Sequence, residues 1–422
     1  MKRRKFLQGL SATALPLATG CSYMRIDPWH FRIRSPYFTS IKHEKEVLNK
    51  ANLFLSDDGK VRILVARGNA YERGYQQGAL LRDEVQENLE YIYNLALKKF
   101  YFEELFAEVY ERMRPFIPQE YVDEMHGLAH GARLPLKLVH HLHILPAMGE
   151  WGGKRQVKKV IKQMMKGAPE EDWDLGTSCS NFSLAPATTS DGNFYVIRIL
   201  DWGLHRISKL HEFPLVTVNI PEKGIASANI GWVGFLGAVS GINAQGITLG
   251  EMGYGDPDNE TLAGVPMIFL LRDVLSYSSN LADVRRIISS SPGTNSFGYV
   301  MTDGKTGEGE LYIRDRDRFV VFKAGQEARD KNEFLPAIAD VSYGGHYEEK
   351  MAELLAQNRG SYSLEMIQNK LIPELVMKSN FQNVIYEPRK LQIWVNNAKD
   401  RSSLAADSPY THIDLAKILR EA

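Results

Sequence analysis

Cys179 is the residue of this 422-residue sequence whose surroundings point to covalent chemistry. It follows a hydrophilic stretch and begins a run of β-prone residues. If the Ser178–Cys179 peptide bond is cut, the new α-amino group of Cys179 has a pKa near ~7.7–8. Such an amine can accept the proton of the neighbouring thiol, so no separate histidine is needed. The position of Cys179 therefore predicts a cysteine nucleophile that is released by self-cleavage.

A papain-like pairing of Cys179 with a distant histidine is a second interpretation. Residues that meet in space need not be close in sequence, and the chain has 11 histidines. The nearest downstream histidines are His205 and His211, and the local signature typical of a papain-like cysteine is missing. The two interpretations differ in whether any histidine is essential.

Two charged residues are expected beside Cys179. The turn signal Asp191-Gly192-Asn193 separates two β-prone stretches, 179–186 and 193–199. If these strands pair antiparallel, Arg198 and Asp201 return to the end where Cys179 begins. An arginine there can stabilise a developing negative charge, and an aspartate can orient the α-ammonium group or the attacking water. Singly, each would be read as a surface salt-bridge residue; as a set with the cysteine, they predict a catalytic site.

The histidines between residues 126 and 143 raise the question of a metal site. His126 and His130 have the spacing of a zinc-protease helix, but that motif needs glutamate after the first histidine, and Gly127 stands there. Three more histidines follow, namely His140, His141 and His143. We interpret all five as ordinary helix histidines, and we expect no metal and no cofactor.

Composition excludes several classes of protein. The chain has 51 basic and 51 acidic residues, so it lacks the positive charge on which nucleic-acid binding depends. Two cysteines cannot form a disulfide framework or a four-cysteine zinc site. No stretch approaches the ~18–20 apolar residues that span a bilayer. A hydrophobic content of 44% is ample for a buried core.

Residues 1–20 have the pattern of a signal peptide. A basic start that contains Arg3-Arg4 is followed by a short apolar stretch, as in twin-arginine export signals. The sequence from Leu17 to Cys21 is similar to a bacterial lipobox, in which the cysteine is diacylated and becomes the mature N-terminus. The alternative is an ordinary signal peptide cut near Gly20. We therefore expect export and a lipid anchor on Cys21 that holds the protein at a membrane, in the periplasm or at the cell surface.

The remaining chain divides at Cys179. Residues 21–45 are expected to form a tether, 46–178 a strand, several helices and a linker, and 179–422 a β-rich part of the same domain. Gly74 and Gly78 are too widely spaced for a dinucleotide fingerprint and are interpreted as packing residues. Helices are predicted at 79–100, 104–114, 119–131, 136–145 and 266–290. Strands are predicted at 61–66, 214–220, 225–230, 233–240, 297–302, 309–313 and 319–323, and a linker at 152–176.

The block from Cys179 to Trp202 resembles the Cys-x-x-Phe … Asp-Gly … Arg-x-x-Asp-Trp pattern of the penicillin acyltransferase-like (acyl-CoA:6-aminopenicillanate acyltransferase) family. These are N-terminal-nucleophile cysteine hydrolases, related to acid ceramidase, N-acylethanolamine amidase and bile-salt hydrolase. The resemblance covers most of the chain. Further matching segments are 68–78, 125–131, 231–237, 240–246 and 383–395.

The resemblance implies an α+β fold, the four-layer αββα sandwich with an N-terminal helical segment. It also implies that cleavage between Ser178 and Cys179 gives two pieces that stay folded together. Ser178 stands where many relatives have glycine. Glu251 falls where relatives place a residue that lines the site, and Asn295 where they place an oxyanion-stabilising asparagine.

Some of these assignments have structural alternatives. Glu251 could be a salt-bridge partner, and Asn295 a turn residue after Pro292-Gly293. Arg272 could contact substrate, although a structural role is the better interpretation. Asn243 is interpreted as a turn residue.

The function implied is cleavage of a small-molecule N-acyl amide through a Cys179 acyl-enzyme. The alternatives are an acyltransferase of the same family and a lipoprotein that keeps the fold without turnover. No nucleic-acid partner is expected, and the acyl and amine groups of the substrate are left open.

Overall fold

The structure, a computed structural model, describes residues 40–100, 103–150, 178–254, 259–330, 333–345 and 348–422. The predicted signal segment, Cys21 and the linker 152–176 lie outside these residues. The first helix, α1 (Ile41–Asn49), begins inside the range predicted as a tether, because Ser40 caps it by accepting from the N–H of His43. The described part of the chain contains no helix long and apolar enough to cross a membrane.

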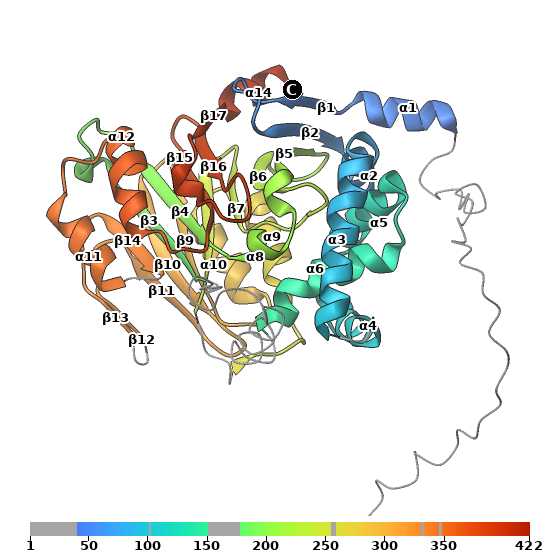
Figure 1. The fold of residues 1–422 in the computed structure, drawn as a ribbon. Coiled ribbons are helices and arrows are strands. Elements are labelled where there is room, and N and C mark those ends of the chain that lie inside the picture. The colour runs from blue at the N-terminus through green and yellow to red at the C-terminus, as the bar shows by residue number, and fades with distance from the viewer. Residues whose placement is uncertain (1–39, 101–102, 151–177, 255–258, 331–332, 346–347) are drawn as a thin grey trace, which may run out of the picture. The chain divides into compact units, whose positions relative to one another are not determined.

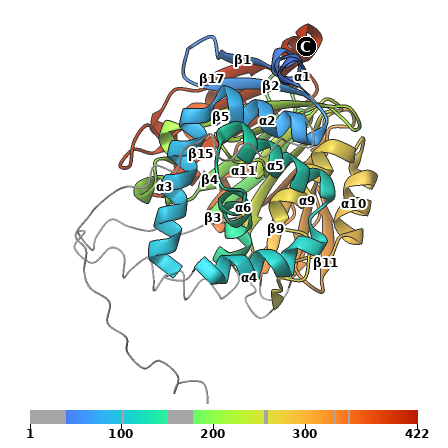
Figure 2. The same cartoon turned by 90° about the vertical axis from the view of Figure 1, so that its right-hand side faces the viewer.

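Two large sheets face each other (Figures 1 and 2). The nine-stranded sheet is antiparallel except for β2–β5, and the six-stranded sheet is antiparallel throughout. In order, the first contains β1 (Asn52–Leu55), β2 (Arg62–Gly68), β5 (Pro214–Pro221), β6 (Ser227–Trp232), β7 (Ser240–Asn243), β8 (Ile247–Gly253), β9 (Phe297–Asp303), β10 (Glu308–Arg314) and β11 (Phe319–Lys323). The second contains β14 (Val341–Gly345), β3 (Ser178–Leu184), β4 (Tyr195–Asp201), β15 (Asn380–Glu387), β16 (Gln392–Asn397) and β17 (Thr411–Asp414).

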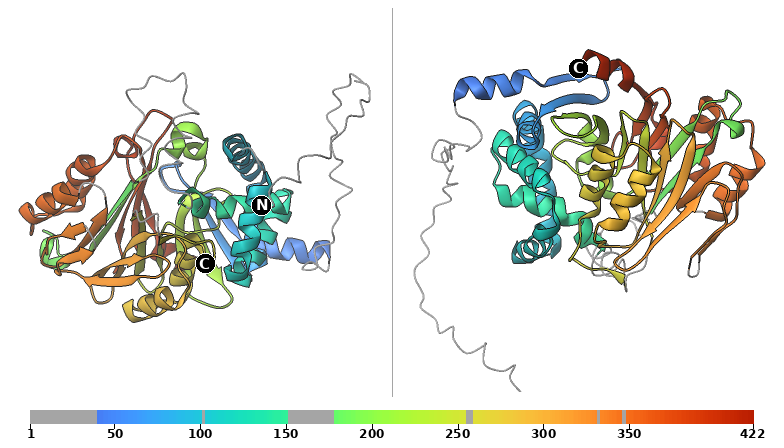
Figure 3. Two further views of the ribbon diagram at one scale, coloured as in Figure 1. Left: turned by 90° about the horizontal axis from the view of Figure 1, so that it is seen from below. Right: turned by 180° about the vertical axis from the view of Figure 1, so that it is seen from behind.

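Helices cover the outer faces of both sheets (Figure 3). On the nine-stranded sheet lie α2 (Ala70–Leu80), α3 (Arg82–Phe100), α4 (Glu103–Met113), α5 (Gln119–Ala132), α6 (Leu136–Glu150), α9 (Met267–Tyr277) and α10 (Leu281–Ser290). On the six-stranded sheet lie α11 (Glu348–Gln357), α12 (Leu364–Met366) and α13 (Ile372–Leu375). Smaller elements are α8 (Leu204–Ile207), the hairpin β12 (Ala328–Asp330) and β13 (Glu333–Leu335), and α14 (Leu415–Glu421). The predicted α+β four-layer sandwich with an N-terminal helical segment is confirmed.

Most predicted elements form close to their expected bounds, and three differ. The helix expected over 79–100 is α3, which begins at Arg82, and a separate helix, α2, precedes it from Ala70, where Asn69 and Glu72 form a reciprocal capping box. The helix expected over 266–290 is two helices, since Asn280 caps the second one. The strand expected over 233–240 is wrong: residues 233–239 form a loop, and β7 begins only at Ser240.

The interpretation of Gly74 and Gly78 as packing residues is confirmed. They lie on α2 against α5, and a Cβ on Gly78 would stand 2.3 Å from the carbonyl oxygen of Leu128. Gly127 and Gly131 of α5 face back onto α2 with the same closeness. The two helix backbones therefore touch, and this contact builds the helical layer that packs beside β2.

We predict that Gly78→Ala lowers the free energy of unfolding by about 1–3 kcal/mol, because the new methyl group collides with backbone that cannot move aside. Urea titration measures the change. Gly231→Ala is the matched control, since the nearest heavy atom to its added Cβ is 4.0 Å away. Equal stability of Gly78→Ala and wild type would contradict the packing role.

Candidate active site

Pairing of β3 with β4 assembles the predicted residues. Cys179 is opposite Leu200, and Arg198 is opposite Asn181, so the alternation of side chains puts Cys179 and Arg198 on one face. Asp201 is opposite Ser178, the residue whose carbonyl belongs to the expected cleavage bond. The antiparallel pairing expected from the turn signal is confirmed.

Arg198 joins the two sheets beside the thiol. Its guanidinium is buried, and Nη2 lies 3.5 Å from the Sγ atom of Cys179. The same nitrogen donates to the Oε2 atom of Glu251 on β8 at 3.1 Å. Asn181, two residues after the cysteine, donates to the backbone carbonyl of Glu251 at 3.0 Å. Glu251 is thus both a salt-bridge partner and a member of the site.

Glycines let the sheets come close enough for these contacts. A Cβ on Gly250 would stand 2.2 Å from Oδ1 of Asn181 and 2.8 Å from Cγ of Arg198. At the neighbouring strand β14, Gly345 has φ +130° and faces the carbonyl of Cys179 at 2.1 Å from its would-be Cβ. Side chains at either position would occupy the space that Arg198 and Cys179 fill.

The thiol of Cys179 is neutral in the intact chain. Burial raises its pKa to about 12, and the negative charges of Glu251 and Asp201 act in the same direction. The guanidinium of Arg198 and the backbone N–H of Asp201 oppose the rise by stabilising the thiolate. A buried, neutral thiol is a poor nucleophile, so turnover of a substrate needs a base beside it.

The hydrogen-bonding environment of Asp201 was not predicted from the sequence. Burial raises its pKa to about 7, although Asn380 donates to its Oδ1 atom at 3.0 Å and so favours the charged form. Asn380 and Asn383 exchange hydrogen bonds, and Asn383 donates to Asn396. The available signal was the set of amide side chains, Asn380, Asn383 and Asn396 among them, within the strands β15 and β16, where unpaired amides would be costly.

Asn295 lies apart from this cluster. It is buried in the stretch before β9, and its Nδ2 atom donates to the backbone carbonyl of Ala147 on α6 at 3.4 Å. Its Oδ1 atom is buried without a hydrogen-bond partner among the described residues. The structure therefore brings together Cys179, Arg198, Asp201 and Glu251, whereas no described contact links Asn295 to them.

Arg272 and Asn243 have structural contacts. Arg272 pairs with Glu124 of α5, with 2.9 Å between Nη2 and Oε2, and it also donates to the carbonyl of Leu236. Asn243 donates to two carbonyls, those of Leu275 and Ser278. These contacts account for both residues without substrate.

No described histidine hydrogen-bonds to Cys179, and the two nearest in sequence have other partners. His205 is fully buried, stacks on Phe381 and lies 3.3 Å from the carbonyl of Trp202. His211 lies 3.8 Å from Glu212. Within the described ranges, no group of three or more His, Cys, Asp or Glu side chains has the arrangement of a metal site.

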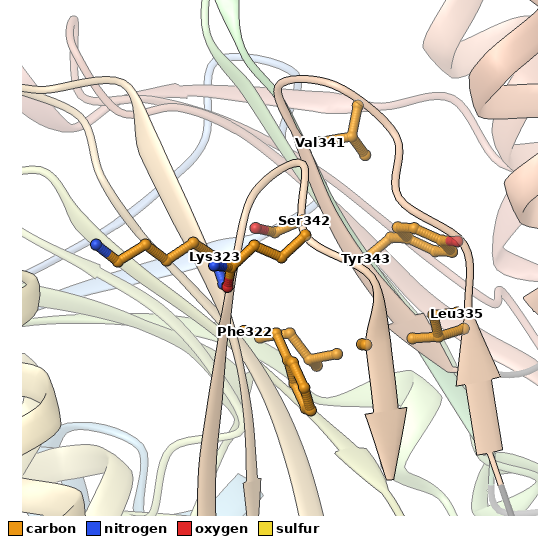
Figure 4. A pocket seen from close by; sticks show the side chains of 9 residues that line it. Phe322, Lys323, Leu335, Val341, Ser342 and Tyr343 are labelled. Atoms are coloured by element: carbon orange, nitrogen blue, oxygen red, sulfur yellow. The ribbon is translucent and has the colours of Figure 1, made fainter.

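A small pocket lies between the end of β11 and the start of β14 (Figure 4). Among the residues lining it are Phe322, Lys323, Leu335 and Tyr343. None of the predicted site residues is among them, so this pocket supplies no argument about the chemistry.

Relatives among curated proteins are distant. No family model matches the chain. It is 24% identical to "Protein dcd1B" of Dictyostelium discoideum over 56% of this chain and 47% of that protein. It is 24% identical to an uncharacterized protein of Archaeoglobus fulgidus over 64% of this chain and 46% of that protein. The chain thus spans about half the length of the curated relatives it matches.

Solved structures with a partial likeness in fold are also of low sequence identity. One is an N-acylethanolamine-hydrolyzing acid amidase ortholog of Caenorhabditis elegans, with 13% identity, a TM-score of 0.38, and 50% of this chain and 93% of that chain covered. Another is a variant of the conjugated bile acid hydrolase of Clostridium perfringens, with 13% identity, a TM-score of 0.35, and 57% and 93% covered.

We predict that Glu251→Gln lowers the pKa of Cys179 by about one unit, because it removes a negative charge and keeps an acceptor for Arg198. Alkylation of Cys179 by iodoacetamide at pH 8 should accelerate roughly tenfold, since the thiolate is the reactive form. Glu310→Gln, on β10 of the same sheet and paired with Arg285, is the matched control. An unchanged alkylation rate in Glu251→Gln would contradict the proposed electrostatics.

Proposed function

We propose that this chain is a self-processing cysteine amidohydrolase that cleaves an N-acyl amide. The observation that carries the proposal is the pairing of β3 with β4, which puts the Cys179 thiol beside Arg198 and the Ser178–Cys179 bond beside Asp201.

Self-cleavage would supply the missing base. Hydrolysis of the Ser178–Cys179 bond leaves a carboxylate on Ser178 and an α-amino group on Cys179, with a pKa near ~7.7–8. The neutral α-amine belongs to the same residue as Sγ and can accept the thiol proton. Without this amine, burial keeps the thiol protonated at neutral pH. Asp201, opposite Ser178 in the sheet, is placed to pair with the resulting ammonium.

Turnover would then proceed in two steps, acylation of Cys179 and hydrolysis of the thioester. The Cys179 sulfur attacks the amide carbonyl, the α-amine takes the thiol proton, and the proton passes to the departing amine as the C–N bond breaks. Water then attacks the thioester with the α-amine as base, which releases the acid and restores the thiol. Arg198 favours the thiolate electrostatically, and Glu251 keeps the guanidinium in place.

Asn295 is proposed as an oxyanion donor, with a carboxamide that would turn from Ala147 to the tetrahedral intermediate. The acyltransferase alternative differs only in the second step, where an amine replaces water. The buried set of Cys179, Arg198, Asp201 and Glu251 favours an enzyme over a silent scaffold. Buried charge lowers stability, and such perturbed groups cluster at functional sites.

The cellular location of the protein is a separate proposal. The basic start with Arg3-Arg4 and the small residues before Cys21 support twin-arginine export and lipidation of Cys21. Acyl chains on Cys21 would then hold the enzyme at a membrane without any basic surface patch.

We predict that purified wild-type protein contains a fragment that begins at Cys179, whereas Cys179→Ala stays a single chain across this bond. Intact-mass spectrometry tests this. Incubation with 4-nitrophenyl acetate should add one acetyl group to the Cys179 fragment, because the ester forms the same thioester intermediate as an amide.

Cys21→Ala is the matched control and should keep both the cleavage and the acetyl adduct. Identical chain lengths in wild type and Cys179→Ala would overturn self-processing. Loss of the adduct in His205→Gln, with folding kept, would favour the papain-like alternative instead.

A further inference from the structure

The loop formed by residues 233–239, which joins β6 to β7, is buried although it pairs with no strand along its length. Val233 and Leu236 have almost no exposed surface. A buried backbone needs partners for its N–H and C=O groups. In this loop the partners are backbone groups of other segments and several side chains from the helical layer.

Three of these side chains belong to the part of the chain before Cys179. Gln77 of α2 accepts from the N–H of Gly234 at 2.8 Å. Asn88 of α3 donates to the carbonyl of Val233 at 2.7 Å. His143 of α6 accepts, through Nε2, from the N–H of Leu236 at 3.0 Å.

The same loop ends at the candidate active site. The N–H of Glu251 donates to the carbonyl of Val239, the last loop residue, at 3.3 Å. Glu251 in turn holds Arg198, whose guanidinium is the cationic group 3.5 Å from the thiol. Hydrogen bonds at both ends of the loop, joined by the loop backbone from Leu236 to Val239, therefore connect α6 to Cys179.

We propose that His143 is a positioning residue for the Cys179 site, acting through loop 233–239 and Glu251, and that protonation of His143 switches this support off. The proposal rests on the proposed function for its catalytic meaning. It assigns a task to the helical part of the chain, which supplies positioning side chains to a site on the other side of the cleavage bond.

The hydrogen bonds of His143 determine its protonation state. Because the N–H of Leu236 can only donate, Nε2 must be unprotonated, and the single proton is on Nδ1, which donates to the carbonyl of Val139 at 2.7 Å. A second proton on Nε2 would turn this acceptor into a donor and leave two N–H groups facing each other. The bond from His143 to the loop would then be lost.

The groups that face His143 act on its pKa in opposite directions, and burial prevails, so the imidazole is neutral near pH 7. Burial lowers the pKa to about 4 and Arg272 of α9 acts in the same direction, whereas the carbonyl of Val139 and the charge of Glu124 on α5 oppose them. His140, on the same helix, is also neutral, with a pKa lowered to about 3 by burial. The rings of Phe235 and Phe269 cover the imidazole and carry no charge.

The test compares His143→Phe, His143→Gln and the matched control His141→Phe, a buried histidine of the same helix that contacts Tyr93 instead of the loop. The probe is iodoacetamide alkylation of Cys179 at pH 7.5, which requires the thiolate but no amide turnover. We expect His143→Phe to slow the alkylation of Cys179 by roughly tenfold or more, because the guanidinium that favours the thiolate is displaced from the sulfur. His143→Gln, which keeps an acceptor, should stay within about threefold of wild type, as should His141→Phe.

A second measurement applies even if His143→Phe does not fold, namely the pH dependence of the alkylation rate in wild type and His143→Gln. As the pH falls through about 4, the alkylation rate of wild type should fall below that of His143→Gln, by up to about tenfold per pH unit. The reason is that only wild type gains a second proton at residue 143. Parallel pH profiles for wild type and His143→Gln, or an equal effect of His141→Phe and His143→Phe, would overturn the proposal. Failure of the amidohydrolase proposal is read separately, as a missing fragment or acetyl adduct in wild type.

Discussion

The buried ion pair between Arg198 and Glu251 is the interaction on which the site depends. It crosses from the six-stranded to the nine-stranded sheet, and a buried charge without its partner would be strongly destabilising. The pair therefore requires the two sheets to approach closely, which the absence of a side chain at Gly250 permits. It also leaves the guanidinium beside the Cys179 sulfur, so one contact joins the two sheets and places a cation at the thiol.

The helical layer contributes to this site without touching the thiol. Its closely packed helices α2 and α5 support side chains that reach loop 233–239, and this loop leads to Glu251. The ion pair of Arg272 with Glu124 secures the same loop from α9 and α5. Because these contacts cross between the parts before and after Cys179, they would hold the two pieces together after self-cleavage.

Much of the site was predictable because it is local in sequence. The turn at Asp191-Gly192-Asn193 determines which residues of β3 and β4 face each other, and this register brings Arg198 to Cys179. Contacts between distant segments were not predictable in this way. Loop 233–239 has the apolar composition of a strand, but side chains from remote segments, among them Gln77, Asn88 and His143, bind its backbone in a buried loop instead.

The sequence by itself determined the class of fold and the grouping of Cys179, Arg198 and Asp201 on one hairpin, since alternation and turn chemistry act over a few residues. The tertiary structure decided what burial does to those groups. It paired Arg198 with Glu251 across the sheets, connected Asp201 to a chain of asparagines from β15 and β16, and left Asn295 bound to the carbonyl of Ala147 on α6. The physical reason is that protonation and hydrogen bonding depend on solvent exclusion and on neighbours from remote segments, which periodicity in a sequence does not encode.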